Sequence, residues 1–296
     1  MNFILKNMTH KTTPYLPKPK WLAKRLPVGG NYQKIKMLLS CADLHTVCQE
    51  ANCPNMFECF SKNTATFMIL GKHCTRNCNF CNIVHDVPDL IDSKEPARIA
   101  DTVQKLGLNY VVITSVTRDD LIDGGAFHFA DTIHAIKKKT PETRIEVLIP
   151  DFKGDITSLQ TVLSAGPHVL NHNIETVESL YPKVRPRADY NRCLGVLKNT
   201  RKMDSCIQIK SGIMVGLGET HEQLEHTFLQ IKDQGCDILT VGQYLAPTRA
   251  HLGVQKYYSP EEFRILEKMA KNIGFKKIAA GPFVRSSYQA NALFES

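Results

Sequence analysis

The strongest constraint on the fold is an alternation of short apolar runs with longer segments of helical periodicity. Six runs rich in apolar and β-branched residues are expected to be strands: 66–70, 110–114, 145–149, 169–174, 207–215 and 238–244. Runs that are apolar at nearly every position suit strands buried on both faces of a sheet. Strands that alternate with helices predict an α/β protein with a parallel sheet and right-handed crossovers.

Helices are expected between and around these runs, because apolar residues recur there at helical spacing. Ile99, Val103 and Leu106 share one such face, and residues 32–44 show a similar pattern before the first run. The sequence Ser259-Pro260-Glu261-Glu262 marks the start of a late helix, since acidic residues in a first turn are favoured by the helix dipole. By analogy with closed barrels, the active site is expected at the carboxyl ends of the strands.

Three cysteines follow the first run in the spacing C-x3-C-x2-C, within a segment that we call the cysteine loop (residues 71–81). They are Cys74, Cys78 and Cys81. Thiolates bind zinc and iron–sulfur clusters, but a structural zinc usually has a fourth protein ligand nearby, and no C-x2-C or H-x3-H partner follows. A [4Fe-4S] cluster held by three cysteines leaves one iron open to an external ligand.

A second set, the N-terminal cysteine group, has the spacing C-x4-C-x5-C and consists of Cys48, Cys53 and Cys59. Zinc or a purely structural role is the alternative here, but two sets of three cysteines favour two clusters. Ten cysteines without a secretion signal indicate metal ligation in a reducing compartment rather than disulfides. The remaining four are expected to be small core residues: Cys41, Cys193, Cys206 and Cys236.

The cysteine loop resembles the cluster-binding loop of radical S-adenosylmethionine enzymes. The order of the two cysteine sets, followed by Arg285-Ser286-Ser287-Tyr288, is similar to the lipoyl synthase family. The resemblance runs from about Lys18 to Tyr288 and includes the stretches 117–121, 171–176 and 242–245. It implies an open partial (β/α)6 barrel, and six expected strands agree with this, being fewer than the eight of a closed barrel.

The resemblance also divides the chain into three parts. Residues 1–60 are expected to be an N-terminal extension that carries the N-terminal cysteine group, and residues 61–250 the partial barrel. Residues 251–296 are expected to be a C-terminal extension with the Arg-Ser-Ser-Tyr motif.

Two [4Fe-4S] clusters and S-adenosyl-L-methionine are the cofactors that the resemblance implies. The cysteine loop would hold the catalytic cluster, with Phe80 shielding it, although simple packing is the alternative for Phe80. The N-terminal cysteine group would hold an auxiliary cluster whose sulfides are consumed. Its fourth ligand would be Ser287 rather than Ser286; a serine oxygen is a harder ligand than a thiolate and could detach when the cluster opens.

Five further residues are candidates for binding S-adenosyl-L-methionine. The resemblance suggests this role for Asn171, Glu175 and Arg187, and polar residues satisfied within a strand-end loop are the alternative. Gly216 and Gly218 end a strand and open a helix, where glycines let backbone approach a ligand. A tight turn explains these glycines equally well. Asp119, Asp120 and Asp123 are expected to cap a helix rather than to bind a metal.

The resemblance implies a reaction of lipoate biosynthesis. A 5′-deoxyadenosyl radical would remove hydrogen from an octanoyl chain, and a sulfide of the auxiliary cluster would capture the carbon radical, first at one and then at the other of C6 and C8. The octanoyl group would be carried by lipoyl domains of 2-oxoacid dehydrogenase complexes or by the glycine-cleavage H protein. A ferredoxin or flavodoxin is the expected type of electron donor.

The net charge of +8 favours an acidic partner, and the carrier domains of this family are commonly acidic. No helix-turn-helix or RNA-binding signature suggests nucleic acid, and no apolar run approaches the roughly 18 residues of a membrane-spanning helix. A cytoplasmic protein is expected. The other hypotheses are an RNA methylthiotransferase, which would need added domains, and an iron–sulfur sensor, for which an open iron has little purpose.

Overall fold

The computed structural model describes residues 16–23, 31–51, 53–61, 66–287 and 290–295. Its centre is a curved eight-stranded sheet with the order β1-β2-β5-β6-β7-β8-β9-β10, in which only β1 is antiparallel to its neighbour. The strands are β1 (His45–Thr46), β2 (Thr66–Ile69), β5 (Tyr110–Ser115), β6 (Arg144–Leu148), β7 (Val169–Asn171), β8 (Gln208–Val215), β9 (Ile238–Gln243) and β10 (Lys277–Gly281).

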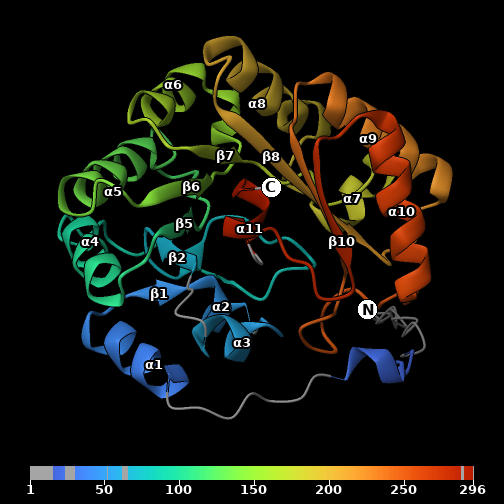
Figure 1. The fold of residues 1–296 in the computed structure, drawn as a ribbon, viewed down its shortest axis with the longest axis horizontal. Helices are drawn as coiled ribbons and strands as arrows, with labels where there is room; N and C mark the ends of the chain where they lie inside the picture. The colour runs from blue at the N-terminus through green and yellow to red at the C-terminus, as the bar shows by residue number, and fades with distance from the viewer. Residues whose placement is uncertain (1–15, 24–30, 52, 62–65, 288–289, 296) are drawn as a thin grey trace, which may run out of the picture.

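Six helices cover the outer face of this sheet and leave its concave face inside, so the molecule is an open partial barrel (Figure 1). They are α4 (Glu95–Leu106), α5 (Ala126–Lys139), α6 (Ile156–Ser164), α8 (Tyr190–Met203), α9 (His221–Asp233) and α10 (Pro260–Ile273). The expected α/β partial barrel is therefore confirmed.

The six predicted strands are all present, with some differences at their ends. The run 169–174 is a strand only as far as Asn171, because the chain then turns and Glu175 adopts a positive φ of 70°. The structure also adds β10, which pairs in parallel with β9. Its sequence, Lys-Ile-Ala-Ala-Gly, has few of the branched or aromatic residues that favour strands, so the pattern did not reveal it.

Local sequence explains where the helices begin and end. Ser259 and Glu262 form a capping box at the start of α10, and Gly274 ends this helix in the left-handed conformation, as expected for these residues. Inside the sheet, the four residues of β2 are all buried, with β1 and β5 on either side and α2 packed against the strand. This packing fixes the point at which the cysteine loop leaves the sheet.

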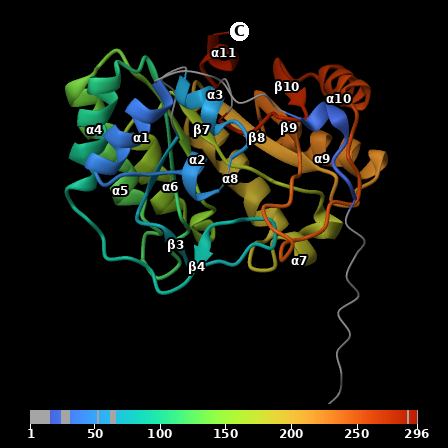
Figure 2. The same ribbon diagram turned by 90° about the horizontal axis from the view of Figure 1, so that it is seen from below.

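The two ends of the barrel differ. Figure 2 shows β3 (His73–Cys74), β4 (Val84–His85) and α7 (Tyr181–Val184) at one end and α11 (Ala290–Glu295) at the other. The end with β3 and β4 follows the carboxyl ends of the parallel strands. The functional residues predicted on the loops after these strands therefore share one end of the barrel, and α11 lies on the opposite side.

The N-terminal segment adds α1 (Asn31–Cys41), β1, α2 (Val47–Glu50) and α3 (Met56–Ser61) beside β2, and β1 pairs with β2. The segments 1–60 and 251–296 thus each contribute a strand to the main sheet, β1 and β10. Among the described helices, none has the length and apolar character needed to cross a bilayer. The first 27 residues hold several prolines and little periodicity, which predicts an extended arm, but residues 1–15 and 24–27 lie outside the described part.

Candidate active site

The cysteine loop stands at the carboxyl end of β2, where it was predicted, and its three cysteines are half-buried. The Sγ of Cys74 accepts hydrogen bonds from the backbone N–H groups of Arg76 and Thr117, each with an N–S distance of 3.4 Å. Burial, and then the nearby thiols, raise the pKa of Cys78 and raise that of Cys81 to about 12. The three thiols therefore influence one another and form a single group.

Neighbouring loops enclose this group. Asn79 donates its backbone N–H to Val184 O at 3.0 Å, and a ring nitrogen of His251 lies 3.0 Å from Cys81 O. Phe80 is half-buried and packs against a small apolar cluster that includes Val184, Leu217 and Tyr244. Phe80 thus joins the cysteine loop to the turn after β8, a packing role that leaves the shielding role as a prediction.

Glu175 lies close to the thiols of the cysteine loop. Burial raises its pKa, while the nearby Arg185 and the amide of Asn173 oppose this rise. Asn173 Nδ2 donates to Glu175 Oε1 at 3.0 Å. The positive φ of 70° at Glu175 is rare outside glycine and costs backbone free energy, which is characteristic of functional positions.

Arg185, which no sequence pattern indicated, lies beside Glu175. Its Nη1 donates to Asn173 O and Tyr181 OH, both at 3.2 Å, and nearby anionic groups outweigh burial and raise its pKa. Its Nε has no hydrogen-bond partner among the described residues. The predicted Arg187 is instead exposed and donates to Thr75 O at 2.9 Å. Periodicity could not separate two arginines that stand two positions apart in one loop.

Asn171 lies deeper, inside the barrel, where a fully buried network holds it. Its Nδ2 donates to Glu146 Oε1 at 3.0 Å, and Lys210 Nζ contacts both oxygens of the same carboxylate at 3.0 Å. Tyr110 donates its hydroxyl hydrogen to Glu146 at 2.6 Å. Asn171 Oδ1 keeps no partner among the described residues, so one acceptor remains available inside the barrel.

Gly216 and Gly218 form the turn between β8 and α9 with φ values of 101° and 114°. A Cβ at Gly216 would lie 2.2 Å from Gln243 Nε2, so only glycine fits. The carboxylate of Glu219 accepts the N–H groups of Gly216 and Leu217 at 2.6 and 2.9 Å. These contacts explain Gly216 as part of a tight turn and occupy two of the amides that a ligand could use.

The N-terminal cysteine group is carried by α2 and α3, with Cys48 on the first helix and Cys59 on the second. Burial and the neighbouring Cys53 and Cys59 raise the pKa of Cys48 to about 12, so these thiols also form one group. Asn82, directly after the cysteine loop, donates to Glu50 O on α2 at 2.9 Å. The two sets of cysteines are therefore neighbours in space.

The C-terminal tail after β10 reaches the N-terminal cysteine group and Glu175, which lies beside the cysteine loop. Asn55 Nδ2 donates to Phe283 O at 2.6 Å, and Gly242 permits the tail to pass, because a Cβ there would lie 2.2 Å from Val284 O. Burial lowers the pKa of Arg285, and the charges of Cys53 and Glu175 oppose this shift. Arg285 thus lies near Cys53 of the N-terminal cysteine group and near Glu175, the carboxylate beside the cysteine loop. Ser286 and Ser287 follow it and are half-buried, while Tyr288 is outside the described residues.

Within the described part of the chain, no three His, Cys, Asp or Glu side chains are arranged to hold a single metal ion. Cysteines of a cubane cluster bind different irons, so their sulfurs lie farther apart than the ligands of one ion. All ten cysteines lie in the described part and none forms a disulfide. Two buried atoms without described partners, Asn173 Oδ1 and Arg185 Nε, fit a polar cofactor beside the cysteine loop, while Asn171 Oδ1 is a further acceptor deeper in the barrel.

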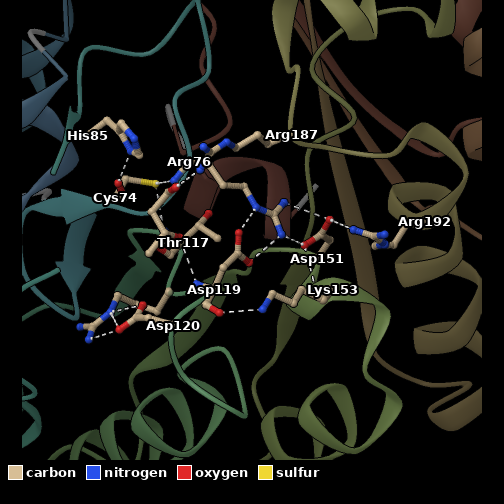
Figure 3. A network of polar contacts seen from close by, with 12 residues as sticks. Cys74, Arg76, His85, Thr117, Asp119, Asp120, Asp151, Lys153, Arg187 and Arg192 are labelled. Atoms are coloured by element: carbon tan, nitrogen blue, oxygen red, sulfur yellow. Dashed lines mark hydrogen bonds and ion pairs between the residues drawn. The ribbon is translucent and has the colours of Figure 1, made fainter. Parts of the chain in front are cut away.

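Two expectations need correction. Of the three acidic residues before α5, only Asp123 caps the helix, by accepting the N–H groups of Gly125 and Phe127. Asp119 and Asp120 instead pair with arginines (Figure 3). The four remaining cysteines are not all core residues, because Cys193 and Cys236 are buried while Cys41 and Cys206 are exposed. Short polar neighbours and chain turns decide exposure at those positions, and residue type does not.

Comparisons with known proteins agree on one family. A model of the radical SAM superfamily matches residues 68–231, and a model of the N-terminal domain of lipoyl synthase matches residues 4–53, earlier than the sequence patterns indicated. Lipoyl synthase of Desulfotalea psychrophila is 55% identical over 277 residues, covering 94% of this chain and 93% of that protein. Lipoyl synthase of Alkaliphilus metalliredigens is 53% identical, covering 94% and 96%.

Solved structures share the fold at low identity. Methylornithine synthase has a TM-score of 0.53 at 15% identity, covering 83% of this chain and 74% of its own. A maturase of the [FeFe]-hydrogenase has a TM-score of 0.56 at 14% identity, covering 71% and 51%. At such identity the likeness concerns only the partial barrel.

Proposed function

Because the chain belongs to the lipoyl synthase family of radical S-adenosylmethionine enzymes, we propose which of its residues carry the family's reaction. That reaction is the radical-mediated insertion of two sulfur atoms at C6 and C8 of a protein-bound octanoyl chain, which forms the lipoyl cofactor. Its cofactors are two [4Fe-4S] clusters and S-adenosyl-L-methionine. Cys74, Cys78 and Cys81 are the ligands of the catalytic cluster.

When bound, the catalytic cluster supplies the electron that cleaves S-adenosyl-L-methionine, and the auxiliary cluster supplies the sulfur atoms. The chain's own residues bind and orient S-adenosyl-L-methionine. The Glu175 carboxylate can pair with the ammonium group of S-adenosyl-L-methionine, and Arg185, with its unpartnered Nε, can pair with the carboxylate. Arg185 takes this role in preference to Arg187, whose side chain is engaged with Thr75 O. Asn171 offers its free Oδ1 from inside the barrel.

For the auxiliary cluster, the ligands are Cys48, Cys53, Cys59 and Ser287. Support comes from the hydrogen bond between Asn55 and Phe283 O, which ties the N-terminal cysteine group to the tail that carries Ser287. Phe80, Gly216 and Gly218 shape the wall beside the cysteine loop. The observation that carries the proposal is the convergence of two cysteine sets and this tail.

The carrier of the octanoyl group is a lipoyl domain of a 2-oxoacid dehydrogenase complex or the glycine-cleavage H protein, and the reductant is a ferredoxin or flavodoxin. The net charge of +8 supports an acidic carrier through long-range attraction. The ten unbridged cysteines support action in the reducing cytoplasm.

The test is the intact mass of an octanoylated lipoyl domain after anaerobic incubation with the reconstituted protein, S-adenosyl-L-methionine and a reductant. We expect a gain of two sulfur atoms, with loss of two hydrogens once the dithiol is oxidised to the dithiolane. An unchanged carrier mass together with 5′-deoxyadenosine would overturn the substrate assignment and leave the radical chemistry. A Cys53→Ala variant is the control for sulfur transfer.

A further inference from the structure

Arg76 stands between the first two cysteines of the cysteine loop, yet its side chain turns inward and is only 5% exposed. A buried guanidinium needs hydrogen-bond acceptors for its donors and a negative charge nearby. Arg76 has both, from two loops that are distant in sequence.

Two aspartates each bind this guanidinium through two hydrogen bonds (Figure 3). Asp119, after β5, accepts from Nε at 2.7 Å and from Nη2 at 2.9 Å. Asp151, after β6, accepts from Nη1 at 3.0 Å and from Nη2 at 2.6 Å. Paired bonds of this kind fix the plane of the guanidinium as well as its position, which a lysine cannot reproduce.

Asp151 has no exposed side-chain surface, and Arg76 nevertheless keeps it ionised. Burial alone would raise its pKa, but the hydrogen bonds and charge of Arg76 lower it to about 2. Arg192 lies 3.6 Å from the same carboxylate and adds a weaker contact. The pair with Arg76 is therefore the main reason why a charge persists here.

The stretch that supplies Asp119 also holds Cys74. Thr75 donates its N–H and its hydroxyl to Thr117 O at 3.0 and 2.9 Å, and Asp119 N–H donates to Thr75 Oγ1 at 3.0 Å. Thr117 N–H in turn donates to Cys74 Sγ. Figure 3 shows these contacts as one continuous set that reaches from Cys74 to Asp151.

We propose that Arg76 is a positioning residue that fastens the cysteine loop to the ends of β5 and β6 and thereby holds Cys74 Sγ against its two backbone N–H donors. Asp119 and Asp151 are the two anchors. The inference rests on the proposed role of Cys74, Cys78 and Cys81 as cluster ligands. Hydrogen bonds to a ligand sulfur stabilise the reduced cluster, so this clamp raises the reduction potential of the cluster.

A second arginine–aspartate pair, in the loop after β5 that also carries Asp119, provides a matched control. Arg118 binds Asp120 through Nε at 2.9 Å and Nη2 at 2.8 Å, and its Nη1 donates to Leu70 O. This pair has similar geometry, but no described hydrogen bond joins it to residues 74–81. Asp120→Asn therefore removes an equivalent charge without releasing the clamp.

The first experiment uses the metal-free full chain and measures the alkylation rate of Cys74 by mass spectrometry, with the exposed Cys206 as internal reference. Arg76→Lys, Asp119→Asn and Asp151→Asn are expected to speed alkylation of Cys74 about tenfold, since each removes charge-assisted bonds that oppose local opening. Asp120→Asn should leave the rate near that of the parent. Rates across pH separate access from a changed thiol pKa.

If Arg76→Lys or Asp151→Asn does not fold, Asp119→Asn decides the matter, because Asp119 is 26% exposed and Asp151 keeps its partner in that variant. A folded Asp119→Asn protein, with thermal unfolding like that of the parent, whose Cys74 reacts at the parent rate overturns the proposal.

The second experiment titrates the reduction potential of the reconstituted cluster in a Cys53→Ala background. Arg76→Lys and Asp119→Asn should make the potential more negative at unchanged iron content, while Asp120→Asn should not. An unchanged potential in all three overturns the clamp. Failure of the ligand assignment has a different signature, because Cys78→Ala would then retain the iron content of its parent.

Discussion

The two cysteine sets are built in different ways, although each offers three thiols. The cysteine loop leaves a buried strand of the main sheet and is fastened by Arg76 to the ends of two neighbouring strands. The N-terminal cysteine group stands on two helices of four and six residues, α2 and α3, which are too short to be stable alone. One set stands on a loop of the barrel, and the other on short helices beside β2, with Cys48 packed into the main core.

This difference agrees with the proposed chemistry. A catalytic cluster that is reduced and reused in each cycle needs a ligand loop that keeps its geometry. An auxiliary cluster that gives up sulfur must open and be rebuilt, so ligands carried by short helices and the turn between them suit it. Two contacts of that set, from Asn82 to Glu50 O and from Asn55 to Phe283 O, come from the loop and the tail that complete the site.

The largest expected effect comes from removing one cysteine of each set. Cys78→Ala should abolish both 5′-deoxyadenosine and product, because the catalytic cluster loses a ligand, whereas Cys53→Ala should abolish only sulfur insertion. Losses beyond about a thousandfold are expected, as for removal of any obligatory catalytic group. Liquid chromatography of 5′-deoxyadenosine beside carrier mass measures both. If Cys53→Ala also lost 5′-deoxyadenosine formation, the two sets would not divide the work in this way.

The second prediction concerns Glu175, which lies between the two cysteine sets and is the proposed partner of the S-adenosyl-L-methionine ammonium group. Its carboxylate is near the thiols of the cysteine loop and near Arg285 of the tail. Glu175→Gln should raise the KM for S-adenosyl-L-methionine about tenfold, since it removes a charge-assisted contact. Steady-state formation of 5′-deoxyadenosine over a range of S-adenosyl-L-methionine concentrations gives the value, with Glu222→Gln on the exposed face of α9 as control. An unchanged KM with a lower product yield would assign Glu175 to the octanoyl side.

Sequence patterns predicted the features that depend on residues close together along the chain. The spacing of Cys74, Cys78 and Cys81 lies within one loop, and the six apolar runs each form one strand, so local reasoning sufficed for both. The strand β10 was not predicted because alanine and glycine carry little strand preference; pairing with β9 and packing against α10 stabilise it.

Contacts between distant residues could not be predicted in the same way. Arg76 and Asp151 are 75 positions apart, and no periodic feature links them. Arg185 and Arg187 have the same side chain, and only the fold shows that one faces Glu175 while the other binds Thr75 O. The expected capping by Asp119 failed for this reason, because Asp119 pairs with the distant Arg76, whereas Asp120 pairs with its near neighbour Arg118.

An effect of intermediate size, on the free energy of unfolding, tests how the cysteine loop is anchored to the barrel through Asp151. Asp151 has its folded-state pKa lowered to about 2, so its ionised form adds stability that is fully present above the unfolded-state pKa near 4 and is lost as the pH falls toward 2. A shift of this size corresponds to about 2 kcal/mol. Asp151→Asn should therefore have a lower free energy of unfolding than the parent at pH 7. The difference between the two free energies should shrink below pH 4. Urea unfolding at several pH values measures it.

A difference in the free energy of unfolding between parent and Asp151→Asn that stayed constant from pH 7 to pH 2.5 would contradict this role of Asp151. Asp120→Asn serves as control. The guanidinium of Arg118 also lowers the pKa of Asp120, but that carboxylate is 36% exposed and solvent screens the pair. Its pH-dependent contribution should be clearly smaller.

The smallest expected effect concerns the contact between the N-terminal cysteine group and the tail. Asn55 is buried and donates to Phe283 O, so Asn55→Ala removes a bond that ties α3 to the tail, at a cost of about 1 kcal/mol. We expect iron bound by the N-terminal set to be lost faster to a chelator, while iron bound by the cysteine loop leaves at the parent rate. Chelator kinetics in Cys78→Ala and Cys53→Ala backgrounds report each set separately. Equal acceleration in both backgrounds would mean that the tail stabilises the whole end of the barrel, and the two sets would then share one support.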